Sequence, residues 1–486
     1  MLLLAAILLL TLLLFLLLLQ SLFRFVTRKK ERVVGFFHPF TNDGGGGERV
    51  LWCAVRAVQE MATDLPIAIY TGDPATPESL ALRALDRFGV KLLQPIRVVR
   101  LQRRKWVEAR TYPRLTLIGQ SLGSMVLAWE ALSAVKPLLF IDTSGYAFTY
   151  VVASWIAGSF VACYTHYPTI SSDMLARVRS RTPLYNNHLS VTRSYWLTTA
   201  KVLYYRVVAW MYGLAGACAD VAMVNSSWTQ SHINRIWRIP NRTFLVYPPC
   251  DTLSLQVLPL ERPTTPAYIV SVAQFRPEKA HELQLEAFVM ALNDLPPALI
   301  TEVQLKFIGS CRHQEDEERV EALREKCHVL GLQQRVEFCL NVSYKELVKL
   351  LGGAIAGLHT MTDEHFGISV VEYMAAGAVV IAHDSAGPKL DIVVEEAGQR
   401  TGFLASSAQE YASAIRHVLL MPDNERLQIT QAARHRASLF SEAMFDTAFK
   451  KAMSPLITKC VDADSGLLTM KRFRVPGRRV NKLHTS

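Results

Sequence analysis

Short apolar segments alternate with longer helical patterns along most of the chain, and this alternation constrains the fold more than any other feature. Val33–Phe37 leads through a glycine run into a helical pattern over Glu48–Glu60, and Ile67–Tyr70 is the next apolar run. Such alternation is typical of α/β folds with parallel sheets. Further strands are predicted at Leu138–Ile141, Val161–Tyr164, Val221–Val224, Tyr268–Val272, Gln304–Ile308, Val336–Phe338, Ala356–His359 and Val379–Ala382.

A proline-rich stretch, from Tyr247-Pro248-Pro249-Cys250 to Pro266, divides the predicted strands into two series. A length of 486 residues is enough for two or three domains, each with its own core. We therefore expect one α/β domain over residues 27–255 and a second over residues 256–440, facing a central cleft that binds the ligand. Residues 441–455 are expected to form a terminal helix that packs back across the domains.

The N-terminus predicts a transmembrane anchor over residues 1–26. Leu2–Leu19 is apolar and without charge. As a helix it spans about 27 Å, close to the thickness of the hydrocarbon core. The alternative is a cleaved signal peptide, which normally carries a basic start and a small-residue cleavage site. Basic residues follow the run, so the positive-inside rule places the rest of the chain in the cytosol.

The formal net charge of +11 excludes few functions by itself. A basic surface beside an anchor favours anionic lipid headgroups or a diphosphate substrate, and a merely solvated basic surface is the alternative. No nucleic-acid-binding signature is present. Residues 456–486 are predicted to form a basic, disordered tail, and contact of this tail with the membrane surface is the alternative to a merely solvated one. The eight cysteines form no C-x-x-C pair, which indicates reduced thiols.

Two stretches, Tyr146–Tyr164 and Leu203–Val224, are more apolar than a soluble domain requires. Each contains a predicted core strand, so burial within the domain is the first interpretation. The alternative is that one of them enters the membrane interface beside the anchor and meets a lipid substrate.

A run of four glycines lies between the first predicted strand and the first predicted helix. Gly45 and Gly46 allow close approach of the backbone to a ligand, and the start of the helix offers N–H groups to an anion, so both glycines are candidates for binding the donor. A flexible turn without a ligand is the alternative interpretation.

Two glutamates flank the start of a helix predicted near Gly367 in the second half of the chain. Glu364 lies in the loop after a strand, and Glu372 lies inside the helix. The N–H groups of Phe366, Gly367 and Ile368 are expected to face a diphosphate. One carboxylate could then contact a sugar near the reacting centre and the other the nucleoside end. Two solvated glutamates are the alternative.

Two further signals follow predicted strands. Arg276 and Lys279 come after the first strand of the second half and supply positive charge for a leaving diphosphate. His166 comes directly after a strand of the first half. Exposed loop cations and a structural histidine are the corresponding alternatives.

These elements occur in the order found in retaining GT-B glycosyltransferases of family four, and the chain resembles that family. The resemblance is closer still to the eukaryotic α-1,2-mannosyltransferases of dolichol-linked oligosaccharide assembly. It runs from about Val33 to about Phe449. The motifs that carry it are Phe36-Phe37-His38-Pro39 before Gly44-Gly45-Gly46-Gly47, Tyr164-Thr165-His166-Tyr167-Pro168, Tyr247-Pro248-Pro249-Cys250-Asp251, Gln274-Phe275-Arg276-Pro277-Glu278-Lys279 and Gly387-Pro388-Lys389-Leu390-Asp391.

The resemblance implies a GT-B fold of two Rossmann-like domains, an N-terminal one for the acceptor and a C-terminal one for the nucleotide sugar. It implies GDP-mannose as co-substrate and no metal cofactor. The acceptor would be a dolichol-diphosphate-linked trimannosyl oligosaccharide, extended by two α-1,2-mannoses with retention of configuration. The implied location is the endoplasmic reticulum membrane, crossed once, with cytosolic catalytic domains. Other early mannosyltransferases of the pathway are candidate partners.

The resemblance also implies a role for each site residue. Glu372 should bind the ribose and Glu364 the donor sugar, with Arg276 and Lys279 at the diphosphate and His166 near the reacting sugar. His166 and Glu364 are thus the candidate catalytic residues. The family often has Gly-Arg directly after the strand where this chain has Ala273-Gln274. No clear carboxylate nucleophile is seen, which favours front-face attack.

Other functions remain open at this stage. One is a GT-B transferase with another nucleotide sugar or lipid acceptor. Another is an inactive GT-B scaffold subunit. A Rossmann oxidoreductase needs an acidic residue at the end of the second strand. Here Glu60 and Asp64 precede that strand, which disfavours the oxidoreductase.

Overall fold

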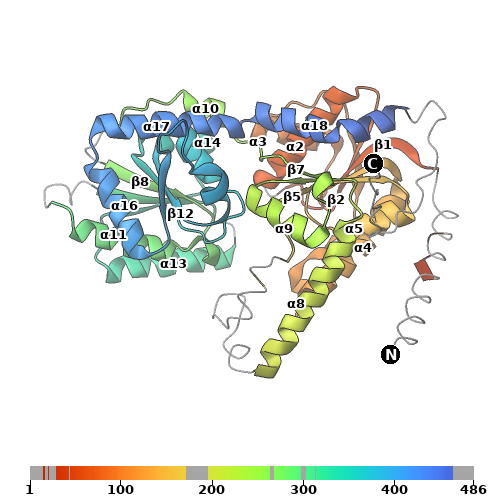
Figure 1. Ribbon diagram of the computed structural model, residues 1–486, viewed down its shortest axis with the longest axis horizontal. Coiled ribbons are helices and arrows are strands. Elements are labelled where there is room, and N and C mark those ends of the chain that lie inside the picture. Colours follow the sequence, from red (N-terminus) through yellow and green to blue (C-terminus); the bar gives the residue numbers. More distant parts are fainter. Residues whose placement is uncertain are drawn as a thin grey trace, which may run out of the picture. The chain divides into compact units, whose positions relative to one another are not determined.

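The computed structural model describes residues 15–16, 20, 29–42, 44–170, 174, 195–262, 267–296, 303–311 and 313–462. These form two compact units. Unit 1 comprises the described residues up to Asn225, Thr229–Val246 and residues 446–462, and unit 2 comprises Ser226–Trp228 and Tyr247–Phe445. Figure 1 shows that each unit is a central sheet covered by helices.

The sheet of unit 1 has seven parallel strands in the order β3-β2-β1-β4-β5-β6-β7. Its strands are β1 (Glu31–Phe37), β2 (Ile67–Thr71), β3 (Arg97–Arg100), β4 (Pro137–Asp142), β5 (Phe160–Thr165), β6 (Val221–Val224) and β7 (Thr243–Leu245). Its helices include α2 (Gly46–Met61), α3 (Pro77–Phe88), α4 (Thr116–Ala134), α5 (Phe148–Val151), α8 (Tyr195–Gly216) and most of α9 (Ser227–Trp237). The strand order reverses between β1 and β4, as in doubly wound folds.

Unit 2 repeats this plan with six parallel strands in the order β10-β9-β8-β11-β12-β13. Its strands are β8 (Ala267–Val272), β9 (Val303–Gly309), β10 (Val336–Leu340), β11 (Ala356–His359), β12 (Val379–His383) and β13 (Gly402–Ala405). Its helices are α10 (Thr252–Gln256), α11 (His281–Asn293), α13 (Gln314–Val329), α14 (Tyr344–Gly353), α15 (Ile368–Ala376), α16 (Ala408–Leu420) and α17 (Asp423–Ala437).

Every strand predicted above is confirmed to within two residues at each end. Three strands were missed: β3, β7 and β13, each at an edge of its sheet. Strand β3 begins and ends with an exposed arginine, so it shows no continuous apolar run.

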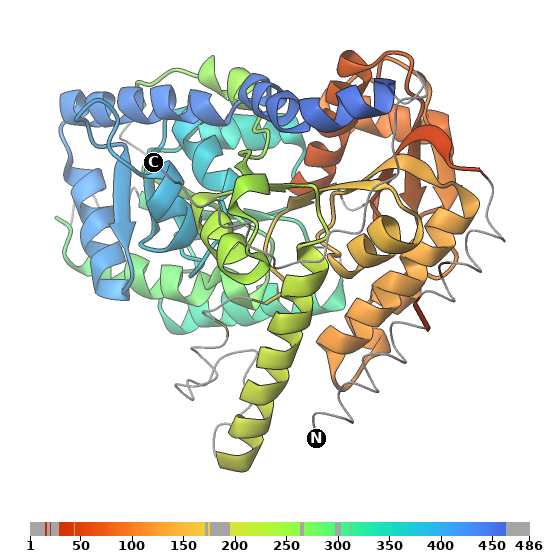
Figure 2. The same cartoon turned by 45° about the vertical axis from the view of Figure 1, so that its right-hand side comes forward.

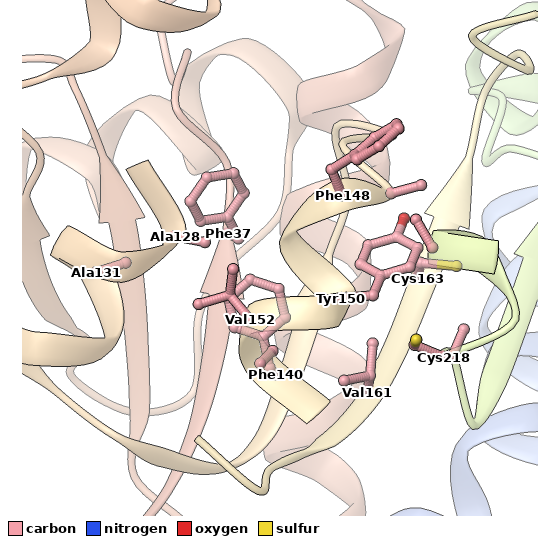
Figure 3. Close-up of a cluster of buried hydrophobic side chains, with 14 of the residues drawn as sticks. Phe37, Ala128, Ala131, Phe140, Phe148, Tyr150, Val152, Val161, Cys163 and Cys218 are labelled. Atoms are coloured by element: carbon pink, nitrogen blue, oxygen red, sulfur yellow. The ribbon is translucent and has the colours of Figure 1, made fainter. Parts of the chain in front are cut away.

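The core of unit 1 packs beneath α4, α5 and α8. Phe140 is fully buried, with its ring centroid 5.6 Å from that of Phe37 and 6.3 Å from that of Tyr70. Figure 3 shows Phe148, Tyr150 and Val152 in the same cluster. The stretch Tyr146–Tyr164 is therefore mostly core, and its burial within the domain is confirmed.

The core of unit 2 lies on both faces of its sheet. Along β12, Val379 and Ile381 belong to one buried cluster, while Val380 and Ala382 belong to the other. The first cluster includes buried residues of α11, α13 and α16, and the second those of α15 and α17. Figure 1 shows α11 and α13 on one side of the strands and α14 and α17 on the other. Burial on both faces explains the nearly continuous apolar runs of these strands.

The terminal helix α18 (Glu442–Val461) belongs to unit 2 up to Phe445 and to unit 1 from Asp446 onward. It is longer than predicted, because it continues past Pro455, where the prediction ended it, so residues 456–461 are helical and the prediction that they belong to a disordered tail was wrong. Leu456, Ile457 and Cys460 are buried. Their burial outweighs the loss of one backbone hydrogen bond at the proline.

The predicted anchor, apart from residues 15–16 and 20, and the tail from residue 463 lie outside the described residues. Within the described part of the chain, no helix is long and apolar enough to span a bilayer. The eight cysteines, all within the described ranges, are free thiols.

We expect Phe140→Ala to lower the free energy of unfolding by about 3–5 kcal/mol, because it removes a buried ring and leaves a cavity. Leu82→Ala on α3 is the matched control, since Leu82 is 58% exposed, and its change should stay within about 0.5 kcal/mol. Urea unfolding measures both. Equal effects of the two substitutions would contradict the assignment of Phe140 to the core.

Candidate functional site

The site residues of unit 2 follow the two central strands of its sheet. Strand β8 leads to α11 on one face and β11 leads to α15 on the other, so the two loops diverge at the carboxyl edge. This reversal is the position at which open α/β sheets bind ligands. Lys279 lies on the first loop and Glu364 on the second.

The structure brings Lys279 and Glu364 into contact. The Nζ of Lys279 donates to Oε2 of Glu364 at 2.5 Å. Their side chains are only 22% and 14% exposed, respectively. A third residue, His359 at the end of β11, has its Nε2 at 3.2 Å from the same Oε2 and is 3% exposed. A lysine and a histidine thus converge on one carboxylate oxygen.

Burial by itself would raise the pKa of Glu364. The hydrogen bond with His359 and the positive charge of Lys279 outweigh burial and hold that pKa well below its usual range. Glu364 is therefore ionised at neutral pH and acts as a hydrogen-bond acceptor.

Hydrogen bonds fix the two loops to each other. Thr360 Oγ1 donates to the carbonyl oxygen of Lys279 at 2.8 Å and accepts from Gln284 Nε2 at 2.8 Å. The N–H of Gly387 donates to the carbonyl oxygen of Glu364 at 2.9 Å. The ion pair is consequently built on backbone that is held from both sides.

A neighbouring histidine links the β11 loop to the β12 loop. His383 is 8% exposed. Its Nδ1 lies 2.9 Å from Ser385 Oγ, and its Nε2 lies 3.2 Å from Thr362 Oγ1. Sequence reasoning missed His359 and His383, although each ends a strand that was predicted.

Helix α15 begins beside Glu364. Gly367 precedes it with φ of 107°, a left-handed conformation that favours glycine. Phe366 is 3% exposed, and its ring centroid lies 5.8 Å from that of Tyr247 and 5.4 Å from that of Phe440. Its side chain is thus part of the core, and only its backbone can approach a ligand. Ile368, the first helical residue, is half-buried and packs against the same core.

A glycine of the β12 loop allows this helix start to form. A Cβ atom at Gly387 would overlap the backbone of Phe366. The Gly387-Pro388 step of the sequence therefore packs directly against the residues that precede α15.

The two remaining donor-binding candidates of unit 2 are Glu372 and Arg276. Glu372 is half-buried on α15. Burial raises the pKa of Tyr344 to about 12, and the charges of Asp251 and Glu372 act in the same direction, which places Glu372 near the start of α14. Arg276 is exposed, and its side chain makes no hydrogen bond or ion pair within the described ranges.

In unit 1, the structure brings His166 to the glycine loop. A Cβ atom at Gly47 would lie 3.6 Å from Nε2 of His166, and that Nε2 lies 3.1 Å from the carbonyl oxygen of Thr143. Gly45 precedes α2, and Gly46 is its first residue. Gly45 is exposed, with open space where a side chain would start. The helix start and His166 therefore share the carboxyl edge of this sheet.

A second histidine lies behind His166. His38 Nδ1 lies 2.8 Å from Thr143 Oγ1. Burial, together with the nearby His166, lowers the pKa of His38 to about 3, so it is neutral at physiological pH. The sequence contained His38 in the first motif, but no role was assigned to it.

A buried acid shapes the same edge. Asp142 accepts hydrogen bonds from Tyr150 Oη at 2.7 Å and from the N–H of Ser144 at 2.9 Å. Burial raises the pKa of Asp142 to about 6, although these bonds oppose the shift. Asp142 thus orders the loop that carries Thr143.

In each unit, glycines, helix starts and titratable side chains meet at the carboxyl edge of a parallel sheet. Two such α/β units are the architecture of GT-B glycosyltransferases. Solved structures agree with this fold. The chain is 14% identical to α,α-trehalose 6-phosphate synthase from Burkholderia multivorans, with a TM-score of 0.61 over 88% of this chain and 99% of that chain. For sucrose-phosphate synthase from Thermosynechococcus elongatus the identity is 18%, with a TM-score of 0.58 over 88% and 100%.

Sequence comparison narrows the class. Residues 31–237 match the family model described as ALG11 mannosyltransferase N-terminus, and residues 258–436 match the model described as Glycosyl transferases group 1. The chain is 48% identical over 433 residues to GDP-Man:Man(3)GlcNAc(2)-PP-Dol alpha-1,2-mannosyltransferase of Mus musculus, covering 88% of each. The protein of the same name from Caenorhabditis elegans is 40% identical over 440 residues, covering 88% of this chain and 92% of that one. The chain therefore belongs to this family of α-1,2-mannosyltransferases, and the resemblance read from its motifs is confirmed.

We expect a double-mutant cycle of Lys279→Met and Glu364→Gln to give a coupling energy of about 1–3 kcal/mol, because the pair is mostly shielded from water. Unfolding free energies of the four variants measure it. The exposed pair Arg324–Glu321, at 3.3 Å with side chains 50% and 74% exposed, is the control and should give less than about 0.5 kcal/mol. Equal coupling in the two pairs would count against the buried contact.

Proposed function

We propose that this chain transfers mannose from GDP-mannose to a dolichol-diphosphate-linked trimannosyl oligosaccharide, forming two successive α-1,2 linkages. The carrying observation is the ion pair of Lys279 and Glu364 at the carboxyl edge of unit 2. Support comes from relatives that bear the name of this activity at 48% and 47% identity.

In this proposal unit 2 binds the donor. Lys279, Arg276 and the N–H groups at the start of α15, from Phe366 to Ile368, contact the diphosphate. Negative charge develops on the diphosphate as GDP leaves, and cations and helix N-termini stabilise such charge. Glu364 accepts a hydrogen bond from a hydroxyl of the mannose, and Glu372 binds the ribose.

We propose that the leaving diphosphate needs no metal cofactor. The supporting observation is that a shielded lysine and a helix start already converge where the diphosphate would lie. The acceptor hydroxyl then attacks from the face that GDP leaves, which gives retention without a carboxylate nucleophile. Turnover that survives excess EDTA would support this view, and turnover restored only by Mg²⁺ or Mn²⁺ would overturn it.

Unit 1 is proposed to bind the acceptor and to bring His166 to the reacting sugar. Its support is the position of His166 beside Gly47, at the start of α2. Gly45 and Gly46 leave the backbone open to close approach. Neutral His38 lies behind His166 and adds no charge to the edge.

We further propose that unit 1 docks on the cytosolic face of the endoplasmic reticulum membrane through helix α8. Its outer face carries Leu203, Val207, Trp210 and Leu214, which are 62%, 43%, 66% and 44% exposed. Their spacing of three and four residues puts them on one side of the helix. Figure 2 shows α8 extending away from the sheet of unit 1.

Basic and aromatic residues accompany this apolar face. Arg206 lies on α8 itself, and the mostly exposed segment Arg103–Arg114 contains Trp106, which is 41% exposed, and five basic residues, two of which pair with carboxylates. Apolar faces flanked by arginine, lysine and tryptophan suit the headgroup region of a bilayer. Gln20, within the predicted anchor, donates to the carbonyl oxygen of the partly exposed Trp155 at 2.8 Å.

We expect Lys279→Met to lower kcat by about 100- to 1000-fold, the usual loss when one group that stabilises an oxyanion is removed. The assay uses the full chain, GDP-mannose and lipid-linked acceptors with two, three, four and five mannoses. Lys349→Met, an exposed lysine of α14, is the control and should leave turnover unchanged.

The proposed activity predicts product from acceptors with three and four mannoses only. Product formed from UDP- or ADP-sugars instead would assign another transferase activity. A purified chain without any turnover would indicate a scaffold subunit. Undiminished turnover by the Lys279→Met variant would refute the role of Lys279.

For the membrane surface, we expect Trp210→Glu to raise the KM for a long-chain acceptor in anionic vesicles about tenfold, because it puts a charge into the apolar face. The KM for GDP-mannose should not change. Leu82→Glu, at an exposed position of α3, is the control. An unchanged acceptor KM, or a parallel rise of both KM values, would argue against docking through α8.

A further inference from the structure

His359 occupies a rigid position at the base of the donor site. It is the last residue of β11, where it pairs with Ala382 of β12, and its carbonyl oxygen accepts a hydrogen bond from Tyr411 Oη at 3.0 Å. Its side chain is 3% exposed. A side chain in such surroundings has little freedom to turn away from its partner.

The only hydrogen bond of this imidazole within the described part of the chain is the one to Glu364. Its Nε2 lies 3.2 Å from Oε2, and because an ionised carboxylate can only accept, Nε2 must carry the hydrogen. The other nitrogen, Nδ1, is buried without a partner. An unpaired buried nitrogen costs stability. Since the imidazole ties no other element together, its placement is explained best by its effect on Glu364.

The two oxygens of Glu364 are used unequally. Both Lys279 and His359 contact Oε2. No hydrogen bond within the described ranges reaches Oε1, which is therefore the oxygen free to accept from a ligand hydroxyl. The orientation of the carboxylate thus depends on what holds Oε2.

We propose that His359 is a positioning residue that fixes Oε2 of Glu364 and so presents Oε1 to a hydroxyl of the donor sugar. The inference rests on the proposed function, in which Lys279 also contacts the diphosphate. A diphosphate competes with Glu364 for the flexible lysine. His359 is fixed by its strand, so it stays with Glu364 when Lys279 is drawn away.

This role predicts that His359 matters only when the donor carries its mannose. GDP lacks the mannose whose hydroxyl Glu364 would hold, so the affinity for GDP should not depend on His359. Substrate turnover should depend on it, because a misplaced Oε1 loses its hydrogen bond to the mannose. A purely structural histidine would instead affect the binding of GDP and of GDP-mannose alike.

The test compares His359→Gln with His359→Asn in the full chain. The amide nitrogen of glutamine is as many bonds from Cβ as Nε2 of histidine and can still donate to Oε2, whereas that of asparagine falls short. We expect the asparagine variant to lower kcat/KM for GDP-mannose about 10- to 100-fold, the effect of losing a hydrogen bond to a charged group. The dissociation constant of GDP should change by less than about twofold, and the glutamine variant should regain most of the activity.

Two controls complete the design. His328→Asn removes an exposed histidine of the same unit and should change neither quantity. His359→Leu fills the space without a polar group and replaces the asparagine variant if that variant does not fold, and the same loss is expected from it. Retained GDP affinity shows in each case that unit 2 is folded.

The proposal is overturned if the glutamine and asparagine variants lose the same activity, if GDP binding weakens in step with turnover, or if no His359 variant has an effect. Glu364→Ala separates this inference from the function on which it rests. If Glu364→Ala leaves turnover intact, the donor-site assignment itself fails. If Glu364→Ala abolishes turnover while His359→Asn does not, only the role of His359 is refuted.

Discussion

Parallel pairing of buried strands is the constraint on which the rest of this structure depends. In a parallel sheet all strands end at the same edge, and loops that leave neighbouring strands toward opposite faces leave room for a ligand there. In unit 2 this geometry brings Lys279, which follows β8, to Glu364, which follows β11, although 85 residues separate them. In unit 1 it brings His166, after β5, to the start of α2. The side chains on the loops that follow these strands then determine which ligand the edge can bind and which reaction it can support.

The contact between Lys279 and Glu364 has to offset the cost of taking two charges out of water. Removing either partner from such a pair leaves an uncompensated charge, so a mostly buried pair is seldom kept for stability alone. Here the carboxylate of Glu364 also accepts a hydrogen bond from His359. Thr360, in the loop after β11, donates a hydrogen bond to the backbone of Lys279 in the loop after β8. A pre-ordered site of this kind suits a reaction in which charge develops on a leaving group, because little reorganisation remains.

The central strands could be predicted from the sequence, because strands that are buried on both faces consist of nearly continuous apolar residues. Sequence reasoning missed β3, β7 and β13, since edge strands are short and partly exposed. The contact of Lys279 with Glu364 follows from strand order, which a single sequence does not state, although both residues were identified from the loops they occupy. His359 was missed because a histidine at the end of an apolar run carries no periodic signal. The proposed role of His359 depends on its contact with Glu364, which lies five residues later, after a turn.

The two cations proposed for the donor site are not equivalent. Lys279 is 22% exposed and held against Glu364, whereas Arg276 is exposed to solvent. Attraction between charges weakens as the surrounding dielectric rises, and salt screens an exposed charge more than a shielded one. Under the proposed function, the lysine would therefore stabilise a diphosphate more strongly than the arginine at equal distance, and its contribution should persist at high salt. The chain has Ala273-Gln274 where the family commonly has Gly-Arg. This departure fits the difference between the two cations, because Lys279 then carries the more shielded positive charge.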